Sequence, residues 1–251
     1  MRLFFLLMPL LLLAQKPLPL NSSYNLQYSE SDDYGFEGFD VVDIDLDDSP
    51  RFEIENFHKA GQRVICYLNV GASEDWREDA DRFDAKLLGK KMEGWEGEKW
   101  FDIRQLDTLK PLISTWFDKA KAKGCDGIHP DNINAYENES GFELSRDDQL
   151  RYNKMLATLA HEKGLLIGLK NCPELASELL EYYDFVISES CYTYDECRPF
   201  EAFVAQKKPV YIIEYDERSF IKGIKDARKK GFFLIYKKST LSKFVARMPE
   251  D

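Results

Sequence analysis

One stretch decides the fold that the sequence predicts: Gly124-Cys125-Asp126-Gly127-Ile128-His129-Pro130-Asp131-Asn132. Two lysines precede Gly124, and this order is typical of a helix end, where cations face the helix dipole and glycine takes a left-handed conformation. A short strand should follow, and it should end near His129 because Pro130 lacks the N–H donor that a central strand needs. Asp131 and Asn132 would then lie just past the C-terminal end of a strand, where parallel α/β sheets hold their reactive groups.

Seven further apolar runs have the length and composition of buried strands. With residues 126–129, the predicted strands are 24–28, 39–46, 64–69, 165–170, 185–189, 210–215 and 232–236. Helical patterns lie between most of them, over 50–61, 111–124, 145–164, 173–182, 199–207 and 219–230, and Ser145 with Asp148 resembles a capping box. This alternation predicts parallel strands, and eight such units close most simply into a single-domain α/β fold, a (β/α)8 barrel of the TIM type.

The first link departs from the ideal unit, because residues 29–38 are too few for a crossover helix. An open, doubly wound sheet is the alternative architecture. No glycine-rich turn with dinucleotide-binding spacing follows the first predicted strand, which speaks against that alternative.

Composition places the chain among globular proteins with an acidic balance. Its 251 residues are 44% apolar and 14% aromatic, and the formal net charge is -11. Nucleic acid is not an expected partner, since phosphate binding needs clustered lysine and arginine. A cationic or neutral ligand fits the charge better, although an acidic balance also serves solubility alone.

The N-terminus has the pattern of a secretory signal peptide over residues 1–15. Arg2 precedes an apolar run over residues 3–13, and the polar shift after Ala14 predicts cleavage near that residue. The run is shorter than the roughly 20 apolar residues of a membrane span, so no span is expected. Residues 16–23 are predicted to be a linker and residues 24–251 the folded domain. We therefore expect a secreted or periplasmic protein.

Export would place the five cysteines in a compartment where disulfides form. Cys191 and Cys197 flank a short loop and are the first candidate pair, but the sequence does not decide the connectivity, and an odd count leaves at least one thiol without an internal partner. The remaining cysteines are Cys66, Cys125 and Cys172. The ligand spacings of structural zinc sites are absent, so no metal is expected.

Carboxylates dominate the predicted C-terminal ends of the strands. The side chains that would converge there are Asp43, Asp45, Asp47, Tyr67, Asn69, Asp131, Asn132, Lys170, Asn171, Glu189, Glu214 and Tyr215. Several carboxylates around one cavity suit acid and base catalysis on a neutral or cationic substrate, with glycoside hydrolysis as the leading example. Phosphate-loop glycine patterns are missing, and we expect no cofactor. A calcium site among residues 43–48 is the competing interpretation, although the glycine and final glutamate of a calcium loop are absent.

The longest connection, residues 71–110, shows no obvious strand and holds Trp76, Trp95 and Trp100. Exposed indole rings suit stacking against sugars, whereas buried ones would pack the connection onto the barrel. A connection of this length is more often functional than not.

Several motifs that are weak alone become specific when they are taken together. They are Asp43-Ile44-Asp45, residues 66–72 (CYLNVGA) with 75–77 (DWR), residues 99–104 (KWFDIR), Asp126-Gly127 with 130–132 (PDN), residues 168–171 (GLKN), Glu189 with Cys191, Tyr194 and Cys197, and Glu214-Tyr215. In these motifs the chain resembles glycoside hydrolase family 114, the endo-α-1,4-polygalactosaminidase group. The resemblance implies a (β/α)8 barrel that cleaves within polymers of α-1,4-linked galactosamine, with Asp131 and Glu189 as the catalytic pair.

In the mechanism that this resemblance implies, Asp131 is the nucleophile or base and Glu189 protonates the glycosidic oxygen, or the roles are exchanged. Lys170 would hold one carboxylate ionised. The predicted substrate contacts are Asp43, Asp45, Tyr67, Asn69, Trp100, His129, Asn132, Lys170, Asn171, Tyr194, Glu214 and Tyr215. The expected partner is an aminosugar polysaccharide, whose positive charge the acidic chain would attract, and a monomer is expected.

His129 and Ser190 stand where the family pattern commonly has acidic residues. His129 would be either a pH-sensitive hydrogen-bond partner or an inward-facing barrel residue. The two lost carboxylates leave a second class open, a carbohydrate-binding barrel without catalysis. A metal-dependent polysaccharide deacetylase is the third, and the scarcity of histidine speaks against it.

Overall fold

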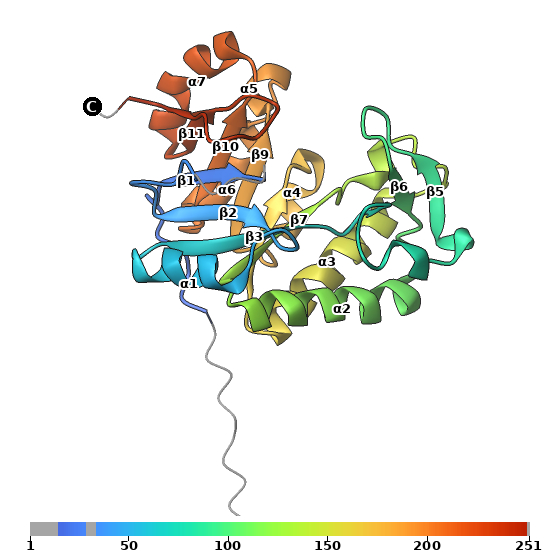
Figure 1. Cartoon of the computed structure of the whole chain (residues 1–251). Coiled ribbons are helices and arrows are strands. Elements are labelled where there is room, and N and C mark those ends of the chain that lie inside the picture. The colour runs from blue at the N-terminus through green and yellow to red at the C-terminus, as the bar shows by residue number, and fades with distance from the viewer. Residues whose placement is uncertain (1–14, 29–33, 250–251) are drawn as a thin grey trace, which may run out of the picture.

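The centre of the molecule is a nine-stranded curled sheet, seen in a computed structural model that describes residues 15–28 and 34–249 (Figure 1). In sheet order its strands are β1 (Tyr24–Gln27), β2 (Val41–Asp45), β3 (Arg63–Asn69), β7 (Gly127–Asp131), β8 (Leu166–Lys170), β9 (Phe185–Glu189), β10 (Val210–Glu214), β11 (Phe233–Tyr236) and β12 (Ala246–Arg247). Neighbours from β1 to β11 are parallel, and β12 is antiparallel to β11. All eight predicted strands are confirmed.

The strands follow one another in the sheet in the same order as in the sequence. A doubly wound sheet reverses its strand order at a switch point, so that alternative is wrong. The curl brings the inner face of β1 against β10, where the rings of Tyr24 and Tyr211 stack with centroids 4.4 Å apart. Among the described residues no backbone pairing joins β1 to β11. The structure is therefore a half-barrel, and closure into a complete (β/α)8 barrel stays a prediction.

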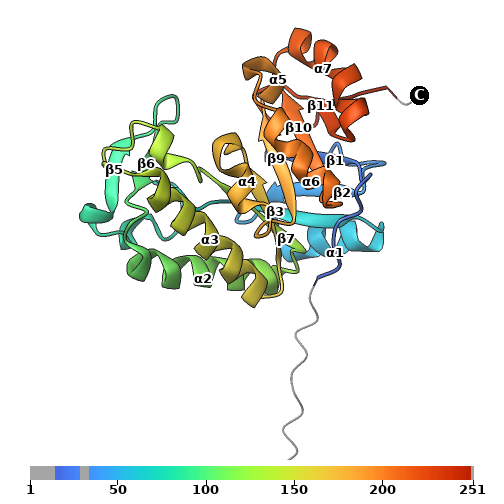
Figure 2. The same cartoon turned by 180° about the vertical axis from the view of Figure 1, so that it is seen from behind.

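Helices cover the outer face of the sheet (Figures 1 and 2). They are α1 (Arg51–Lys59), α2 (Leu106–Lys123), α3 (Arg146–Glu162), α4 (Ala176–Leu179), α5 (Cys191–Tyr194), α6 (Glu201–Ala205) and α7 (Glu217–Lys230). The capping box of Ser145 and Asp148 at α3 is confirmed. Helix α2 begins before Pro111, the predicted start, because the Gln105 carbonyl accepts the N–H groups of Thr108 and Leu109 and so forms the first turn earlier.

The connection between β3 and α2 contains a second, three-stranded sheet, contrary to the prediction that it holds no strand. Strands β4 (Ala72–Glu74), β6 (Glu98–Phe101) and β5 (Leu88–Lys91) pair antiparallel in that order. Each is only three or four residues long, and β5 pairs with β6 irregularly, so none shows the alternation by which strands are recognised. We call residues 71–105 the insert. In Figure 1 its strands β5 and β6 lie to one side of the curled sheet.

Two predicted boundaries need correction, the end of one strand and the start of the folded domain. Pro130 and Asp131 lie inside β7 rather than after it, and proline is tolerated there because the pairing of β7 with β8 extends only to Ile128. The predicted linker, residues 16–23, is part of the fold: Leu18 is 3% exposed in the core on the inner face of the sheet, and Ser22 Oγ hydrogen-bonds with Tyr211 Oη at 2.6 Å. The predicted signal peptide falls almost wholly outside the described residues.

Two disulfides cross-link the fold. Cys191–Cys197, the predicted pair, is confirmed, and Cys66–Cys125 joins β3 to the segment before β7. Cys172 is a buried free thiol. In the described part of the chain, no helix has both the length and the apolar character needed to cross a membrane.

Candidate active site

A pocket of about 630 Å³ opens at the C-terminal ends of the central strands. One wall comes from β3, β7, β8 and β9, and it presents Tyr67, Asp131, Asn132, Lys170, Asn171 and Glu189. The insert forms the opposite wall, chiefly with Trp95, Glu98 and Trp100. Seven predicted site residues, these six and Trp100, therefore line one cavity, because parallel strands place their C-terminal ends at the same edge.

Lys170 lies between the two predicted catalytic carboxylates. Its Nζ is 2.8 Å from Asp131 Oδ1 and 2.9 Å from Glu189 Oε2. Burial lowers the pKa of Lys170, but the two carboxylates outweigh burial and raise it above its usual value. The lysine therefore carries a permanent positive charge in the pocket.

Asp131 is held as an anion. Burial raises the pKa of its carboxyl group, but the ammonium of Lys170, with smaller contributions from His129 and hydrogen bonds, lowers it to about 2. Tyr67 also donates its hydroxyl to Asp131 Oδ2 at 3.0 Å. An ionised carboxylate at neutral pH can act as a nucleophile or a base but not as a proton donor.

Glu189 has a separate set of partners beyond Lys170. Tyr215 donates its hydroxyl to Glu189 Oε1 at 2.5 Å, and the backbone N–H of Glu189 donates to Asn171 Oδ1 at 2.8 Å. The two predicted residues Tyr215 and Asn171 thus orient a carboxylate whose side chain is 24% exposed to the pocket.

The chain makes the same unusual turn after each of the three central residues. Asn132, Asn171 and Ser190, which follow Asp131, Lys170 and Glu189, have φ angles of 60°, 50° and 59°. Left-handed backbone is disfavoured for residues with a Cβ, and asparagine tolerates it best. Three such residues at one sheet edge are typical of a functional site, where surrounding packing imposes strained conformations.

Glu98 is a pocket residue that sequence reasoning missed. Its Oε2 accepts hydrogen bonds from Asn69 Nδ2 at 2.9 Å and Asn132 Nδ2 at 3.4 Å. Burial, together with the negative charges of Glu74 and Asp131, raises the pKa of Glu98 to about 7. The available signal was its position two residues before Trp100, because residues i and i+2 of a strand share a face once β6 is recognised.

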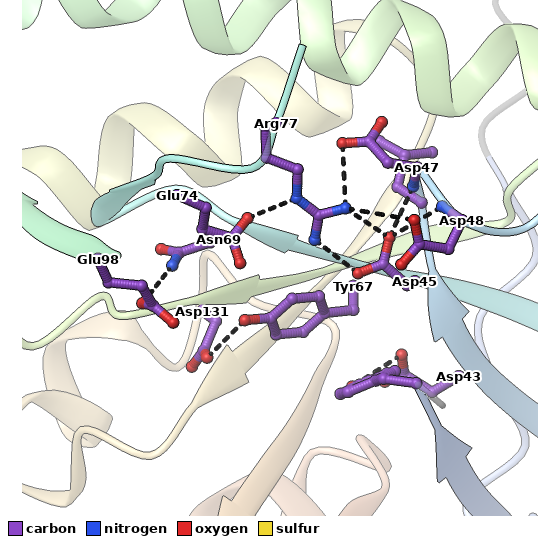
Figure 3. Close-up of polar contacts among 12 residues, drawn as sticks. Asp43, Asp45, Asp47, Asp48, Tyr67, Asn69, Glu74, Arg77, Glu98 and Asp131 are labelled. Carbon is purple, nitrogen blue, oxygen red and sulfur yellow. Dashed lines mark hydrogen bonds and ion pairs between the residues drawn. The ribbon is translucent and has the colours of Figure 1, made fainter. Parts of the chain in front are cut away.

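Asp45, a predicted substrate contact, does not line the pocket. Figure 3 shows Arg77 between Asp45 and Glu74. The guanidinium binds both oxygens of Asp45, at 3.0 and 2.7 Å, and Glu74 Oε2 at 2.7 Å. Asp47 and Asp48 also lie within 4 Å of it, at 3.4 and 3.9 Å. These aspartates therefore tie the insert to the end of β2, and an arginine occupies the place that the calcium interpretation gives to a cation.

Asp43 and His129 are buried and do not line the pocket. His129 Nδ1 is 2.8 Å from Asp43 Oδ2, and the hydroxyls of Tyr24 and Tyr28 also donate to Asp43. Both side chains are buried, and Nε2 of His129 has no hydrogen-bond partner among the described residues. His129 therefore faces the interior and hydrogen-bonds with Asp43, and the pH sensitivity of this hydrogen bond stays a prediction.

Four further predicted contacts, Asn69, Tyr215, Glu214 and Tyr194, are not part of the pocket lining. Glu214 is completely buried and accepts the N–H of Tyr192 at 2.8 Å and the hydroxyl of Thr193 at 2.8 Å, so it supports α5. Tyr194, on α5, is 68% exposed and is not part of the pocket lining. Trp95 is 59% exposed at the rim, while Trp100 is 5% exposed and packs the insert against the core.

The described residues contain no group of three or more histidine, cysteine, aspartate or glutamate side chains arranged to hold a metal ion. The site instead consists of two carboxylates that share one lysine, at the C-terminal edge of a parallel sheet, beside a wall with aromatic residues. This arrangement is typical of glycosidases.

The comparisons with known proteins then specify the family. The chain belongs to glycoside hydrolase family GH114, whose model matches residues 13–250. The solved structure of Aspergillus fumigatus Ega3 in complex with galactosamine has 28% sequence identity and a TM-score of 0.88, and covers 93% of this chain and 98% of that chain. The glycoside hydrolase domain of PelA from Pseudomonas aeruginosa, at 18% identity, shares the fold with a TM-score of 0.74, over 90% of this chain and 98% of that domain.

Two curated relatives have sequence identities of 27% and 25%. The uncharacterized protein MJ1477 of Methanocaldococcus jannaschii is 27% identical over 182 residues, which are 64% of this chain and 50% of that protein, so the chain spans about half the length of this relative. An uncharacterized protein of Deinococcus radiodurans is 25% identical over 237 residues, which cover 83% of this chain and 75% of that protein.

Proposed function

We propose that this protein cleaves internal α-1,4 linkages in a galactosamine-containing polysaccharide, with retention of configuration at the anomeric carbon. The observation that carries the proposal is the contact of one ammonium, Lys170 Nζ, with Asp131 at 2.8 Å and Glu189 at 2.9 Å. The two contacted oxygens are then at most about 5.7 Å apart, the sum of these distances, whereas inverting glycosidases hold their carboxyl groups about 6.5 to 9.5 Å apart and retaining ones about 5 to 5.5 Å.

Asp131 is the nucleophile, because its pKa of about 2 keeps it ionised. Its carboxylate forms a bond to the anomeric carbon while the glycosidic C–O bond breaks, and Glu189 transfers its proton to the leaving oxygen. Glu189 then takes a proton from water, whose oxygen displaces Asp131 from the anomeric carbon. Tyr67 and Lys170 bind Asp131 and stabilise it as the leaving group of this second step.

An aminosugar substrate is supported from two directions. The structure of Ega3, with a TM-score of 0.88 and 28% identity, was solved with galactosamine. In addition, the chain has a net charge of -11 and lines its pocket with several carboxylates, which attract a cationic polymer.

The test is cleavage of α-1,4-linked galactosamine chains, deacetylated or N-acetylated, by the wild type and by Asp131→Asn and Glu189→Gln. We expect shortened chains from the wild type and losses of roughly 100-fold or more in kcat from each variant. Glu55→Gln is the matched control, because Glu55 lies on α1 outside the pocket lining, is 50% exposed in its side chain and pairs with Arg51. NMR of the first reducing ends should show the α anomer.

Each other outcome selects an alternative. The β anomer would replace retention by inversion, and equal cleavage by all variants would remove both carboxylates from the mechanism. Binding without chain shortening would favour a carbohydrate-binding barrel, while acetate release that a chelator stops would favour a deacetylase.

The same proposal includes secretion of a monomer with a closed (β/α)8 barrel. The leader pattern and the two disulfides support export, because disulfides persist in oxidising compartments. The stacking of Tyr24 on Tyr211 supports barrel closure. Size-exclusion chromatography of secreted protein tests the monomer.

A further inference from the structure

Glu98 is a buried carboxylate of the pocket that forms no ion pair with a lysine or arginine of the described residues. It is 5% exposed, and its Oε2 accepts from the amides of Asn69 and Asn132. Its Oε1 accepts no hydrogen bond from the residues that the structure describes, and none of their lysines or arginines forms an ion pair with it. One oxygen of a buried acid is thus left without a partner inside the protein.

Three other carboxylates of the pocket pair with a lysine. Asp131 and Glu189 share Lys170, and at the rim Glu139 pairs with Lys90 at 2.8 Å. Glu137 accepts the hydroxyl of Tyr136 at 2.5 Å. A buried anion without a cation is costly, so the free oxygen of Glu98 marks a place where an external cation would stabilise the protein.

The charges of the residues around Glu98 also favour a bound cation. Burial, Glu74 and Asp131 raise the pKa of Glu98, and the Asn69 amide and the charge of Arg77 lower it without outweighing them. Arg77 itself is bound by Asp45 and Glu74. The potential at Glu98 is therefore negative, and a bound ammonium would relieve the repulsion that Glu98 experiences from Asp131 and Glu74.

The position of Glu98 allows it to contact a bound substrate. It lies on β6, in the insert wall, whereas Asp131 and Glu189 lie on the strand ends of the same pocket. Because Glu98 Oε2 accepts from Asn69 and from Asn132, the residue after Asp131, a sugar ring held for attack by Asp131 would lie beside Glu98. An ammonium substituent can donate charge-assisted hydrogen bonds to Glu98, whereas an N-acetyl group brings no charge and would leave the carboxylate buried without compensation.

We propose that Glu98 selects an unacetylated amino sugar by accepting hydrogen bonds from its ammonium group in the subsite beside Asp131. The inference rests on the proposed hydrolase function and adds the group that distinguishes free amine from acetamide. Because ammonium binding requires the ionised carboxylate, binding near neutral pH releases the proton that a part of the Glu98 population carries.

Two measurements test this assignment. In the first, kcat/KM is compared on fully deacetylated and fully N-acetylated α-1,4-galactosamine chains. Glu98→Gln should lower the ratio between the two by at least about 10-fold, the usual range for a lost charged hydrogen bond, while cleavage of the acetylated chain stays the same or improves. Glu55→Gln, on α1 and away from the pocket, should leave the ratio unchanged. An equal loss on both chains, or an unchanged ratio in Glu98→Gln, would overturn the assignment.

The second measurement is binding of the monosaccharide galactosamine, which has no glycosidic bond to cleave, by calorimetry in buffers of different ionisation enthalpy. The wild type should release protons on binding at neutral pH, and Glu98→Gln should bind more weakly and release none. Proton release that persists in Glu98→Gln, or no binding by the wild type, would contradict the proposal. If the wild type cleaves no polymer, the hydrolase proposal fails and this titration still decides the role of Glu98.

Discussion

Lys170 and Asp131 form a nearly buried ion pair, with 2.8 Å between Nζ and Oδ1, at the edge where β7 and β8 end. The pairing of these two strands extends only over Gly127 and Ile128, so the strands separate before they reach the pair. The opening leaves room for a long lysine side chain that reaches Glu189 as well. One cation thereby contacts both carboxylates.

Replacing that cation should change the pH profile as well as the rate. Lys170→Met removes the ammonium group that lowers the pKa of Asp131, and burial, which raises this pKa, would then dominate. The pKa of Asp131 should therefore rise from about 2 to above its ordinary value. We expect kcat/KM to fall by at least about 100-fold at neutral pH and the acidic limb of its pH profile to move to higher pH. Lys90→Met, whose partner Glu139 is exposed, is the control. An unmoved acidic limb would contradict the role given to Lys170.

The same pair affects stability. A carboxyl group whose pKa is lowered on folding stabilises the protein above its unfolded pKa of 3.8, and this contribution is lost as the pH falls toward about 2. Thermal melting of the wild type should therefore show a fall in Tm below about pH 4. Asp131→Asn should lose part of this pH dependence, and parallel curves for the two proteins would contradict the lowered pKa.

Tyr67 should contribute to catalysis through its hydroxyl and to stability through its ring. Tyr67→Phe removes the 3.0 Å hydrogen bond to Asp131 but keeps the ring contact with Tyr28, whose centroid is 4.5 Å away. We expect kcat to fall by about 10-fold, consistent with one hydrogen bond to a charged group, and Tm to change little. Tyr182→Phe, whose ring lies over Lys154, is a control away from the pocket. A large loss of Tm with unchanged kcat would place Tyr67 in packing alone.

Arg77 should be the residue that holds the insert in place. Arg77→Met leaves Asp45 and Glu74 buried without a cation, and breaking a buried pair in this way costs about 3 to 5 kcal/mol. Arg51→Met removes an exposed pair with Glu55 and should cost less than about 1 kcal/mol. Urea unfolding measures both. Equal midpoints for the two variants would show that the insert does not depend on Arg77.

The two disulfides should differ in their contributions. The loop closed by Cys66–Cys125 spans 59 residues and that of Cys191–Cys197 spans 6. Loop-closure entropy then predicts about 4 kcal/mol for the first and about 2 kcal/mol for the second. Unfolding of the paired alanine variants tests the order, and a larger loss on removing Cys191–Cys197 would show that strain or unfolded-state structure dominates over loop length.

The strands and helices were readable from the sequence because their signals are local. Apolar runs of four to eight residues, the Ser145 capping box and glycines after helices mark the elements, and their alternation predicts a parallel sheet. The end of β7 was placed too early because proline was taken as a stop. The missing pairing toward β8, which makes proline acceptable there, is a tertiary feature.

The insert escaped prediction because its three strands are stabilised by pairing between segments far apart in the chain. Its carboxylate Glu98 therefore could not be connected with Asp131. Similarly, the positions of Asp45 and Glu214 at strand ends predict substrate contacts. In the structure the oxygens of Asp45 accept hydrogen bonds from Arg77, and Glu214 accepts one from a backbone N–H of α5.

The sequence by itself determined the order of the strands, the edge at which reactive groups would gather, and the carboxylates Asp131 and Glu189 at that edge. Only the tertiary structure decided which of those groups share a cavity, which form ion pairs or hydrogen bonds inside the protein, and which remain charged. The physical reason is that strand identity depends on near neighbours in the chain, whereas burial, ion pairing and pKa depend on side chains that folding brings together from distant segments.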